Sequence, residues 1–426
     1  MKSLLDKVNA KLNAQGGFLK AVSVLVGGTA FAQLIGFLCL PILTRLYTPE
    51  DYSVLGVYVA IVAILAVISC LRFDIAIPIP ENENDGKALL LLSFLSNTIF
   101  SIILYAVLFI SYPYIQHYKI IDQLSYWIWL IPLGVFVSGF YSALQFWATR
   151  HKRFKDIAKT RMTQAISGNA ASLAGGMFSV GFGGLIVGQL LNFSGGLFKL
   201  AVSAKKDLAS VKSSPLKATF TKYSKFPKYS VLEALFNTSA VQLPLIIIAI
   251  FLIGPEVGYL MMSMKILGIP MSLIGRAMSQ VYLSHAADYH KAGKLYYYTK
   301  QVLIKILKII IVPFALLALM SPYIFNYIFG EKWEGLGDYI LIMIPWYFFQ
   351  ILSSPISMAL HVINLQGLAL FLQILGFVVR VLVLLVVALL GSKFIVEYYI
   401  LSGMIFYTIY LITIVLLIKR NGNGVD

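Results

Sequence analysis

The chain has 426 residues, of which 59% are hydrophobic and 12% are charged, and its formal net charge is +16. Soluble domains carry about 25% charged residues, so this composition excludes an ordinary soluble protein. The Lys and Arg lie mostly in short connections between apolar runs, which is typical of membrane topology and does not indicate nucleic-acid binding. Runs of about 20 apolar residues recur along the chain and predict an all-α polytopic membrane protein.

Twelve transmembrane helices are predicted. In chain order they cover 21–44, 52–73, 88–111, 125–148, 161–180, 183–203, 229–253, 257–280, 302–325, 338–361, 367–390 and 395–418. The first of these runs is long enough to span the bilayer, so we expect no cleavable signal peptide. The fifth and sixth are separated only by residues 181–184, where three Gly favour a tight turn.

Positive charge alternates between the connections. With twelve helices, the Lys- and Arg-rich segments all fall on one side: the first 20 residues, the connections before the fifth, seventh and ninth helices, and the C-terminal tail. The positive-inside rule then places both termini in the cytoplasm. Topology alone accounts for these clusters, with specific binding as the alternative.

A faint internal repeat relates the two halves of the chain. The matching pairs, each offset by about half the chain, are Ser23-Val24-Leu25 with Ser230-Val231-Leu232, Pro49-Glu50 with Pro255-Glu256, and Gly86-Lys87 with Gly293-Lys294. They predict two pseudo-symmetric six-helix lobes related by an axis along the membrane normal. The expected domains are lobe 1–203, a cytoplasmic linker over 204–228 and lobe 229–426.

Two cations lie within the predicted helix 257–280. Lys265 and Arg276 are eleven residues apart, which is three helical turns plus about 20°, so they share one face. Ser272 and Gln280 extend that face. Because a charge at mid-bilayer costs about 2.5–3.5 kcal/mol on insertion scales, this face is expected to line a partner helix or a water-filled cavity.

Other polar residues at helix depth or helix ends are also candidates. They are Gln33, Arg45, Arg72, Asp74, Glu233, Asn237 and Arg380. Arg72 and Asp74 could snorkel to the nearby surface, and Arg45 could anchor its helix end. A structural ion pair between Glu233 and Arg276 is the main alternative to a binding role. The excess of cations suits an anionic substrate, because Arg and Lys both bind phosphate.

No catalytic constellation is evident, so the chain is not expected to be an enzyme. The sequence has no P-loop, no metal-ligand spacing and no nucleophile–base order. Transport would therefore run on an ion or substrate gradient.

Four segments resemble the bacterial polysaccharide-transport proteins, and more narrowly the Wzx-type O-antigen flippases. They are LPILTRLYTPEDYSVLGVY (40–58), LRFDIAIPIPENENDGKALL (71–90), ALQFWATRHKRFKDIAKTRMTQAI (143–166) and IFGEKWEGLGDYILIMIPWYFFQILSSPISMAL (328–360). The wider superfamily includes the lipid II flippases and the multidrug and toxic-compound extrusion antiporters.

The resemblance implies a central cavity between two lobes and alternating access. It implies that undecaprenyl-diphosphate-linked oligosaccharide moves from the cytoplasmic to the periplasmic leaflet of the bacterial inner membrane. Lys265 and Arg72 fall near cavity arginines of lipid II flippases. We nominate as substrate-binding residues Lys265, Arg276, Arg72, Arg380, Arg45, Gln33 and Gln280. A polysaccharide polymerase and a chain-length regulator are the expected protein partners, and nucleic acid is not.

Ion coupling is expected through acidic and amide side chains, with no other cofactor. In sodium-bound relatives such residues come from the seventh and eleventh helices. Here the seventh offers Glu233 and Asn237, but the eleventh has Gln373 and Arg380 and no acid. That departure weakens a sodium site and leaves proton coupling open, with Asp74 as a further candidate. The sequence leaves two other functions open: an ion-coupled antiporter for organic cations, and a non-transporting scaffold of the glycan-assembly machinery.

Overall fold

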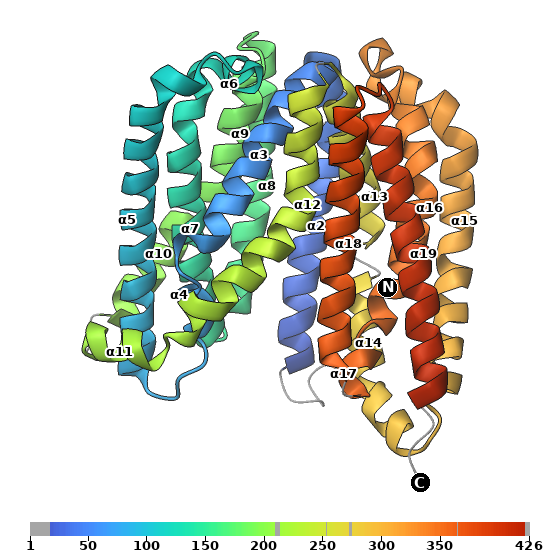
Figure 1. Cartoon of the computed structure of the whole chain (residues 1–426). Helices are drawn as coiled ribbons and strands as arrows, with labels where there is room; N and C mark the ends of the chain where they lie inside the picture. Colours follow the sequence, from blue (N-terminus) through green and yellow to red (C-terminus); the bar gives the residue numbers. More distant parts are fainter. Residues whose placement is uncertain (1–17, 209–213, 253, 272–274, 364, 422–426) are drawn as a thin grey trace, which may run out of the picture. The chain divides into compact units, whose positions relative to one another are not determined.

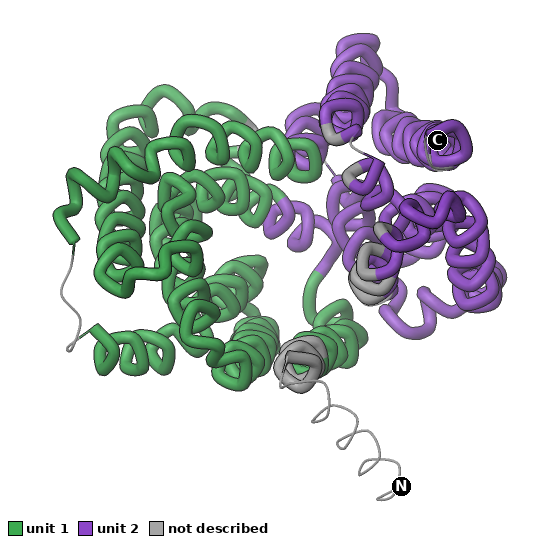
Figure 2. Tube along the Cα trace, turned by 90° about the horizontal axis from the view of Figure 1, so that it is seen from below, with its two compact units in different colours: residues 1–47, 57–242 green, residues 48–56, 243–426 purple. Residues whose placement is uncertain are grey.

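The computed structural model describes residues 18–208, 214–252, 254–271, 275–363 and 365–421, and within these ranges every regular element is helical. The chain divides into two compact units: residues 1–47 with 57–242 form unit 1, and residues 48–56 with 243–426 form unit 2 (Figure 2). The all-α fold predicted from the sequence is confirmed. The lobe boundaries at 203 and 229 stay a prediction.

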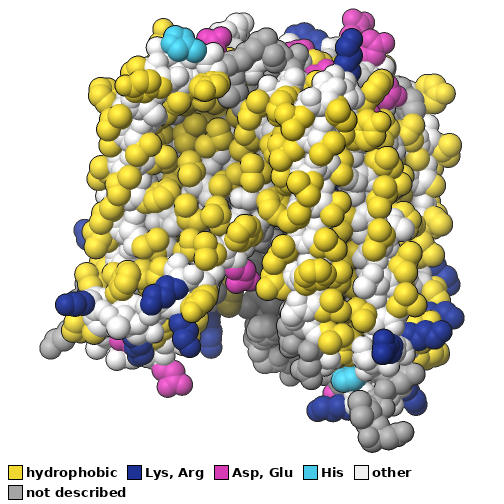
Figure 3. Space-filling model, viewed as in Figure 1, with side chains coloured by type: hydrophobic (Ala, Val, Ile, Leu, Met, Phe, Trp, Pro, Cys, Tyr) yellow, Lys and Arg dark blue, Asp and Glu magenta, His cyan; other side chains and the backbone are white. Residues whose placement is uncertain are grey.

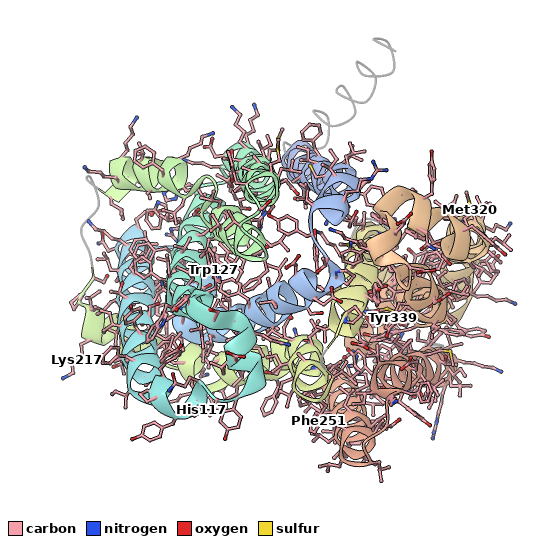
Figure 4. The ribbon with its side chains drawn as sticks, turned by 90° about the horizontal axis from the view of Figure 1, so that it is seen from above. His117, Trp127, Lys217, Phe251, Met320 and Tyr339 are labelled. Atoms are coloured by element: carbon pink, nitrogen blue, oxygen red, sulfur yellow. The ribbon has the colours of Figure 1, made fainter. Side chains whose placement is uncertain are left out.

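Unit 1 contains most of the helices of the first half of the chain (Figure 1). They are α2 (Phe18–Leu46), α4 (Phe73–Ala76), α5 (Glu83–Ile115), α6 (Lys119–Leu124), η1 (Ser125–Trp129), α7 (Leu130–Arg150), α8 (Phe154–Met177), α9 (Gly183–Ser194), α10 (Leu197–Leu208), α11 (Leu216–Lys222) and η2 (Phe226–Ser230). Two helices, α3 (Pro49–Ser69) and α12 (Val231–Phe251), each contribute residues to both units. Figure 4 views unit 1 from the end that carries α6 and η1, where His117 and Trp127 are labelled.

Unit 2 contains the helices of the second half. They are α13 (Glu256–Pro270), α14 (Arg276–Lys291), α15 (Leu295–Phe329), η4 (Glu331–Trp333), α16 (Leu336–Ile356), α17 (Ala359–Val362), α18 (Gln366–Leu389) and α19 (Ile395–Asn421). The predicted helix 257–280 is described as two elements, α13 and α14. Met271 and Gly275, on either side of residues 272–274, both have right-handed helical backbone angles. Residues 272–274, including Ser272, lie outside the described residues, so the shared face of Lys265 and Arg276 stays a prediction.

Large apolar side chains cover the outer surfaces of the long helices. On α5, for example, Ile102, Phe109 and Ile110 are exposed, and on α18 Leu389 is exposed. Figure 3 shows hydrophobic side chains along the helices of each unit. A soluble protein would not leave such continuous apolar faces in water, so these surfaces are the ones that contact lipid.

Ten helices of the described residues are long and apolar enough to cross a membrane. A multi-pass membrane protein is therefore confirmed, whereas the count of twelve is not. The two predicted spans without a counterpart among the ten are those at α8 and α13. α8 has 24 residues but is rich in polar side chains, and the predicted span 257–280 includes residues 272–274, which lie outside the described residues.

The polar helix α8 is sheltered by close packing against α2 and α9. Tyr47, directly after α2, donates a hydrogen bond of 2.6 Å to the carbonyl of Ser172 on α8. Between α8 and α9 the backbones meet at glycines: a Cβ added at Gly188 would lie 2.7 Å from the carbonyl oxygen of Gly168. Small residues permit such an approach in membranes, where close van der Waals packing drives helix association.

One end of unit 1 is rich in ion pairs. Arg153 forms a bidentate pair with Asp207, with its shortest N–O distance at 2.6 Å, and Lys199 pairs with Asp156. Figure 3 shows Lys and Arg gathered at the α11 end of unit 1. The clustering agrees with the charge pattern of the sequence, and by the positive-inside rule we propose that this end faces the cytoplasm.

At this end, side chains at the start of α5 form hydrogen bonds with residues that precede and follow segment 209–213. Lys87 Nζ donates to the Leu208 carbonyl at 2.8 Å. Asp85 accepts hydrogen bonds from Ser214 Oγ at 2.7 Å and from Lys222 Nζ at 2.6 Å. The bond to Asp85 raises the pKa of Lys222 above its ordinary value. α10 and α11 are thereby fastened to α5.

The turn between α4 and α5 is closed by Arg150, whose side chain is 6% exposed. Its Nε pairs with Glu83 at 3.2 Å, and its Nη1 donates to the carbonyls of Ile77 and Pro80. The carbonyls of this turn have no partner within a helix, and one guanidinium therefore supplies their hydrogen bonds.

Arg150→Met should destabilise unit 1 while leaving the helices apolar enough to insert. Hydrogen bonds to a charged group contribute about 1.5–3 kcal/mol, so we expect a loss of about 2 kcal/mol and a fall in melting temperature of about 4–8 °C. Thermal unfolding in detergent measures it. Lys155→Met is the matched control, because Lys155 is exposed. Equal melting temperatures for the two variants would contradict the role given to Arg150.

Candidate functional site

Unit 1 contains a set of polar side chains at helix depth that we call the α7 polar cluster: Arg72, Asp74, Ser142, Gln145, Arg161 and Gln164. Ser142 Oγ donates a hydrogen bond of 2.6 Å to Asp74 Oδ2. Arg161 Nη2 donates to Gln145 Oε1 at 2.7 Å. Ser142 and Gln145 are three residues apart on α7 and so lie on one helix face. The hydrogen bonds to Asp74 and from Arg161 are therefore made on the same side of α7.

The position of Asp74 follows from a left-handed turn after α3. Leu71 and Arg72 have φ angles of 49° and 59°. Non-glycine residues seldom adopt this region, and here it reverses the chain direction so that α4 begins at Phe73. Phe73 and Ile77 are buried in an apolar core with Leu144 of α7. That packing fixes α4 beside α7 and brings Asp74 to Ser142.

Two polar atoms of the cluster lack partners. Asp74 is 5% exposed, and its Oδ1 is buried without a hydrogen bond in the described part of the chain; Arg72 Nε is in the same condition. A buried polar atom without a partner costs about 1–3 kcal/mol, and more when it is charged. Such atoms commonly mark a place where water, an ion or a ligand completes the set.

Arg161 is the other cation of the cluster. Its guanidinium carbon lies 5.6 Å from the centre of the Tyr141 ring, and its Nη1 is 3.5 Å from Gln164 Oε1. The side chain is half-buried, so part of its fork remains available. With two guanidinium groups and one carboxylate, the cluster has a net positive charge and offers bidentate donors of the kind that match phosphate.

Sequence reasoning nominated Arg72 and Asp74 but missed Arg161, because the fifth span was predicted to begin at residue 161. The helix starts earlier, at Phe154, which moves Arg161 two turns into α8. A usable signal was the spacing of the polar Arg161 and Gln164 and the small Gly168, which repeats at three and four residues and marks one non-lipid face of a helix.

The other nominated residues lie on several helices. Lys265 is exposed on α13 and Arg45 is exposed in the last turn of α2. Gln33 of α2 is half-buried, and Glu233 and Asn237 are exposed on α12. α14 contains Arg276 and Gln280, but their side chains lie outside the described residues, so the Glu233–Arg276 pair is untested. The roles of these residues stay predictions.

Arg380 lies inside unit 2, where it packs α18 against α19. Its side chain is 7% exposed, its Nε donates to the Gly376 carbonyl at 2.8 Å, and its guanidinium lies over the rings of Phe406 and Tyr407 at 5.1 and 6.0 Å. Cation–π contacts stabilise such a buried guanidinium. These contacts favour a structural role for Arg380, and its assignment to the substrate stays a prediction.

Three solved structures place the fold among membrane transporters. A lipid II flippase, MurJ, in an inward closed conformation has a TM-score of 0.71 at 14% identity, over 93% of this chain and 90% of that chain. An inward-facing multidrug resistance MATE family transporter of the MOP superfamily has a TM-score of 0.64 at 14% identity, over 92% and 96%. A MOP superfamily transporter from Pyrococcus furiosus, described as having a binding pocket of reverse polarity, has a TM-score of 0.60 at 14% identity, over 95% and 99%.

These similarities define the class as a multi-pass membrane protein with the fold of MOP superfamily transporters. Residues 42–337 match the model of the polysaccharide biosynthesis protein family, so the chain belongs to that family. The family predicted from the sequence is thus confirmed. No protein with a curated description matches the chain.

Proposed function

We propose that the protein is a flippase that moves undecaprenyl-diphosphate-linked oligosaccharide from the cytoplasmic to the periplasmic leaflet of the bacterial inner membrane. Membership of the polysaccharide biosynthesis family and the transporter fold support this function. The observation that carries it furthest is the cationic α7 polar cluster, in which a half-buried guanidinium and a buried unpartnered Nε lie at helix depth.

In this proposal the cations hold the diphosphate. In unit 1, Arg161 and Arg72 would bind phosphate as bidentate donors. In unit 2, Lys265 and Arg276 are the candidate cations, with Lys as a point charge. Amide side chains such as Gln33 and Gln280 would bind the sugars. The undecaprenyl chain would stay in the hydrocarbon layer throughout, so it would not have to enter the polar site.

Coupling to an ion gradient would involve a carboxylate that changes its partner or its protonation. Asp74 fits this role because one oxygen accepts from Ser142 while the other is buried and unpartnered. An ion bound at the free oxygen would supply the partner that this buried atom lacks among the described residues. Glu233 and Asn237 are the alternative, and either H⁺ or Na⁺ would serve as the coupling ion.

The test is replacement of the unit 2 cations. Lys265→Ala and Arg276→Ala should each reduce surface polysaccharide and raise lipid-linked intermediates on the cytoplasmic side, in a strain that lacks the chromosomal copy. Lys265→Arg and Arg276→Lys should retain most of the function, because the charge is preserved. Wild-type glycan and intermediate levels in both alanine variants, at normal protein abundance, would remove Lys265 and Arg276 from the substrate site.

A second candidate is an antiporter for organic cations. The likeness to a MATE transporter and the buried Asp74 carboxylate favour it, whereas the excess of Arg and Lys opposes it. Drug resistance on expression, with normal glycan in a deletion strain, would support the antiporter. If a variant with a blocked cavity still exports glycan, the protein would instead be a scaffold in the glycan-assembly machinery, beside a polymerase and a chain-length regulator.

A further inference from the structure

α15 presents one continuous exposed stripe along its whole length. The residues are spaced three or four apart, and all are exposed: Tyr297, Gln301, Lys305, Lys308, Val312, Leu316, Leu319, Tyr323 and Tyr327. This spacing keeps neighbouring members on the same side of a helix. Figure 4 shows α15, labelled at Met320, at the edge of unit 2. The stripe changes from polar to apolar between Lys308 and Val312.

The length of the helix fixes the depth of these groups in a bilayer. From Lys308 to Tyr327 the helix rises about 28 Å at 1.5 Å per residue, close to the hydrocarbon thickness of about 30 Å. Tyr323 and Tyr327 are 80% and 85% exposed, as expected of an aromatic belt at one interface. Lys308 and Lys305 then lie at the opposite interface, at the level of lipid headgroups.

The charge at that interface is uncompensated. α15 contains no Asp or Glu, and Lys294, Lys300, Lys305 and Lys308 are all exposed. Among the described residues no carboxylate lies within ion-pair distance of any of these four ammonium groups. Figure 3 shows Lys and Arg side chains at the edge of unit 2 that carries α15. These ammonium groups are therefore open to an anionic group from the surroundings.

We propose that this stripe is a binding site for an anionic phospholipid of the surrounding bilayer. The lipid phosphate would lie between Lys305 and Lys308, which are one helical turn apart, with the Gln301 amide and the Tyr297 hydroxyl available above it. One acyl chain would run along Val312 and Leu316. Charge complementarity argues for this occupant, because an attached anionic lipid supplies both the missing negative charge and an apolar tail in register with the apolar half of the stripe.

A fluorescent reporter in the apolar half of the stripe tests the proposal. The full chain, with Cys39 and Cys70 replaced by Ala and Leu316→Cys labelled with bimane, is reconstituted with brominated phosphatidylglycerol or brominated phosphatidylcholine at equal mole fractions. Brominated phosphatidylglycerol should quench more strongly. Lys305→Gln with Lys308→Gln should lower its relative affinity at least fivefold, given the contribution of about a factor of five per basic residue near an anionic surface.

Two controls separate this site from general electrostatics. Lys205→Gln with Lys206→Gln removes the same charge from two exposed residues of α10 and should leave the preference intact. Lys305→Arg with Lys308→Arg should also preserve it. Equal quenching by the two lipids in the parent protein would overturn the proposal. An unchanged preference in the Gln variant, or an equal loss in the α10 control, would overturn it as well. None of these outcomes depends on the transported substrate.

Discussion

Arg161→Gln is expected to reduce export of lipid-linked oligosaccharide by at least tenfold. The half-buried guanidinium donates to Gln145 at 2.7 Å and lies near the Tyr141 ring, so it is held in place with part of its fork unused. A hydrogen bond from a charged donor contributes about 1.5–3 kcal/mol, which corresponds to about a 10- to 100-fold change in an equilibrium or rate. Glutamine keeps polarity but removes the charge that would bind a diphosphate.

The measurement is the amount of surface polysaccharide in a complemented deletion strain, with protein abundance and melting temperature recorded in parallel. Arg161→Lys should retain intermediate activity, since it keeps the charge but loses bidentate geometry. Lys159→Gln removes a charge from an exposed position on the same helix and should have little effect. Wild-type export by a stably folded Arg161→Gln variant would remove Arg161 from the substrate site.

Gly188→Ala should destabilise unit 1 strongly, although it adds only one methyl group. The new Cβ would lie 2.0 Å from Ser172 Oγ and 2.7 Å from the Gly168 carbonyl oxygen. The second contact is with backbone, so relief requires α8 and α9 to separate. Overpacking costs about 1–3 kcal/mol in general, and we place this case at about 3 kcal/mol, or about 6–12 °C in melting temperature.

The matched control is the same substitution in a helix with open space. Gly268→Ala on α13 meets no atom within 4 Å, so it should leave stability unchanged or raise it by about 0.5–1 kcal/mol through the better helix propensity of alanine. Thermal unfolding of the two variants in one detergent makes the comparison. A Gly188→Ala protein as stable as its parent would show that the α8–α9 approach is not tight.

Long apolar helices could be predicted from the sequence because a helix in contact with lipid needs a continuous run of apolar side chains. The predicted spans 88–111 and 367–390 correspond to α5 (Glu83–Ile115) and α18 (Gln366–Leu389). The bounds of α8 were harder to predict. α8 packs against α2 and α9, so it can carry polar side chains, and its composition does not show where it lies in the membrane. The predicted span begins at residue 161, whereas the helix begins at Phe154, and Arg161 was overlooked at the predicted span end.

The candidate site was partly predictable, because a charge at helix depth is conspicuous in sequence but its partners are not. Arg72 and Asp74 were found as charges, yet the Ser142 contact depends on the left-handed turn at 71–72, which no spacing rule signals. Arg380 illustrates the opposite case. Its charge suggested a substrate contact, whereas the aromatic rings of α19 that receive it become visible only when the helices are packed.

The fastening of Leu208 and Ser214 to the first turn of α5 has an entropic consequence. Both ends of segment 209–213 are held by neighbouring residues of one helix, Lys87 and Asp85. Lengthening a connection whose ends are already fixed costs only about 0.6 kcal/mol for each doubling of its length. A peptide epitope or a small fluorescent domain inserted there would therefore leave α10 and α11 in place, and gives a convenient handle for following the protein in intact cells.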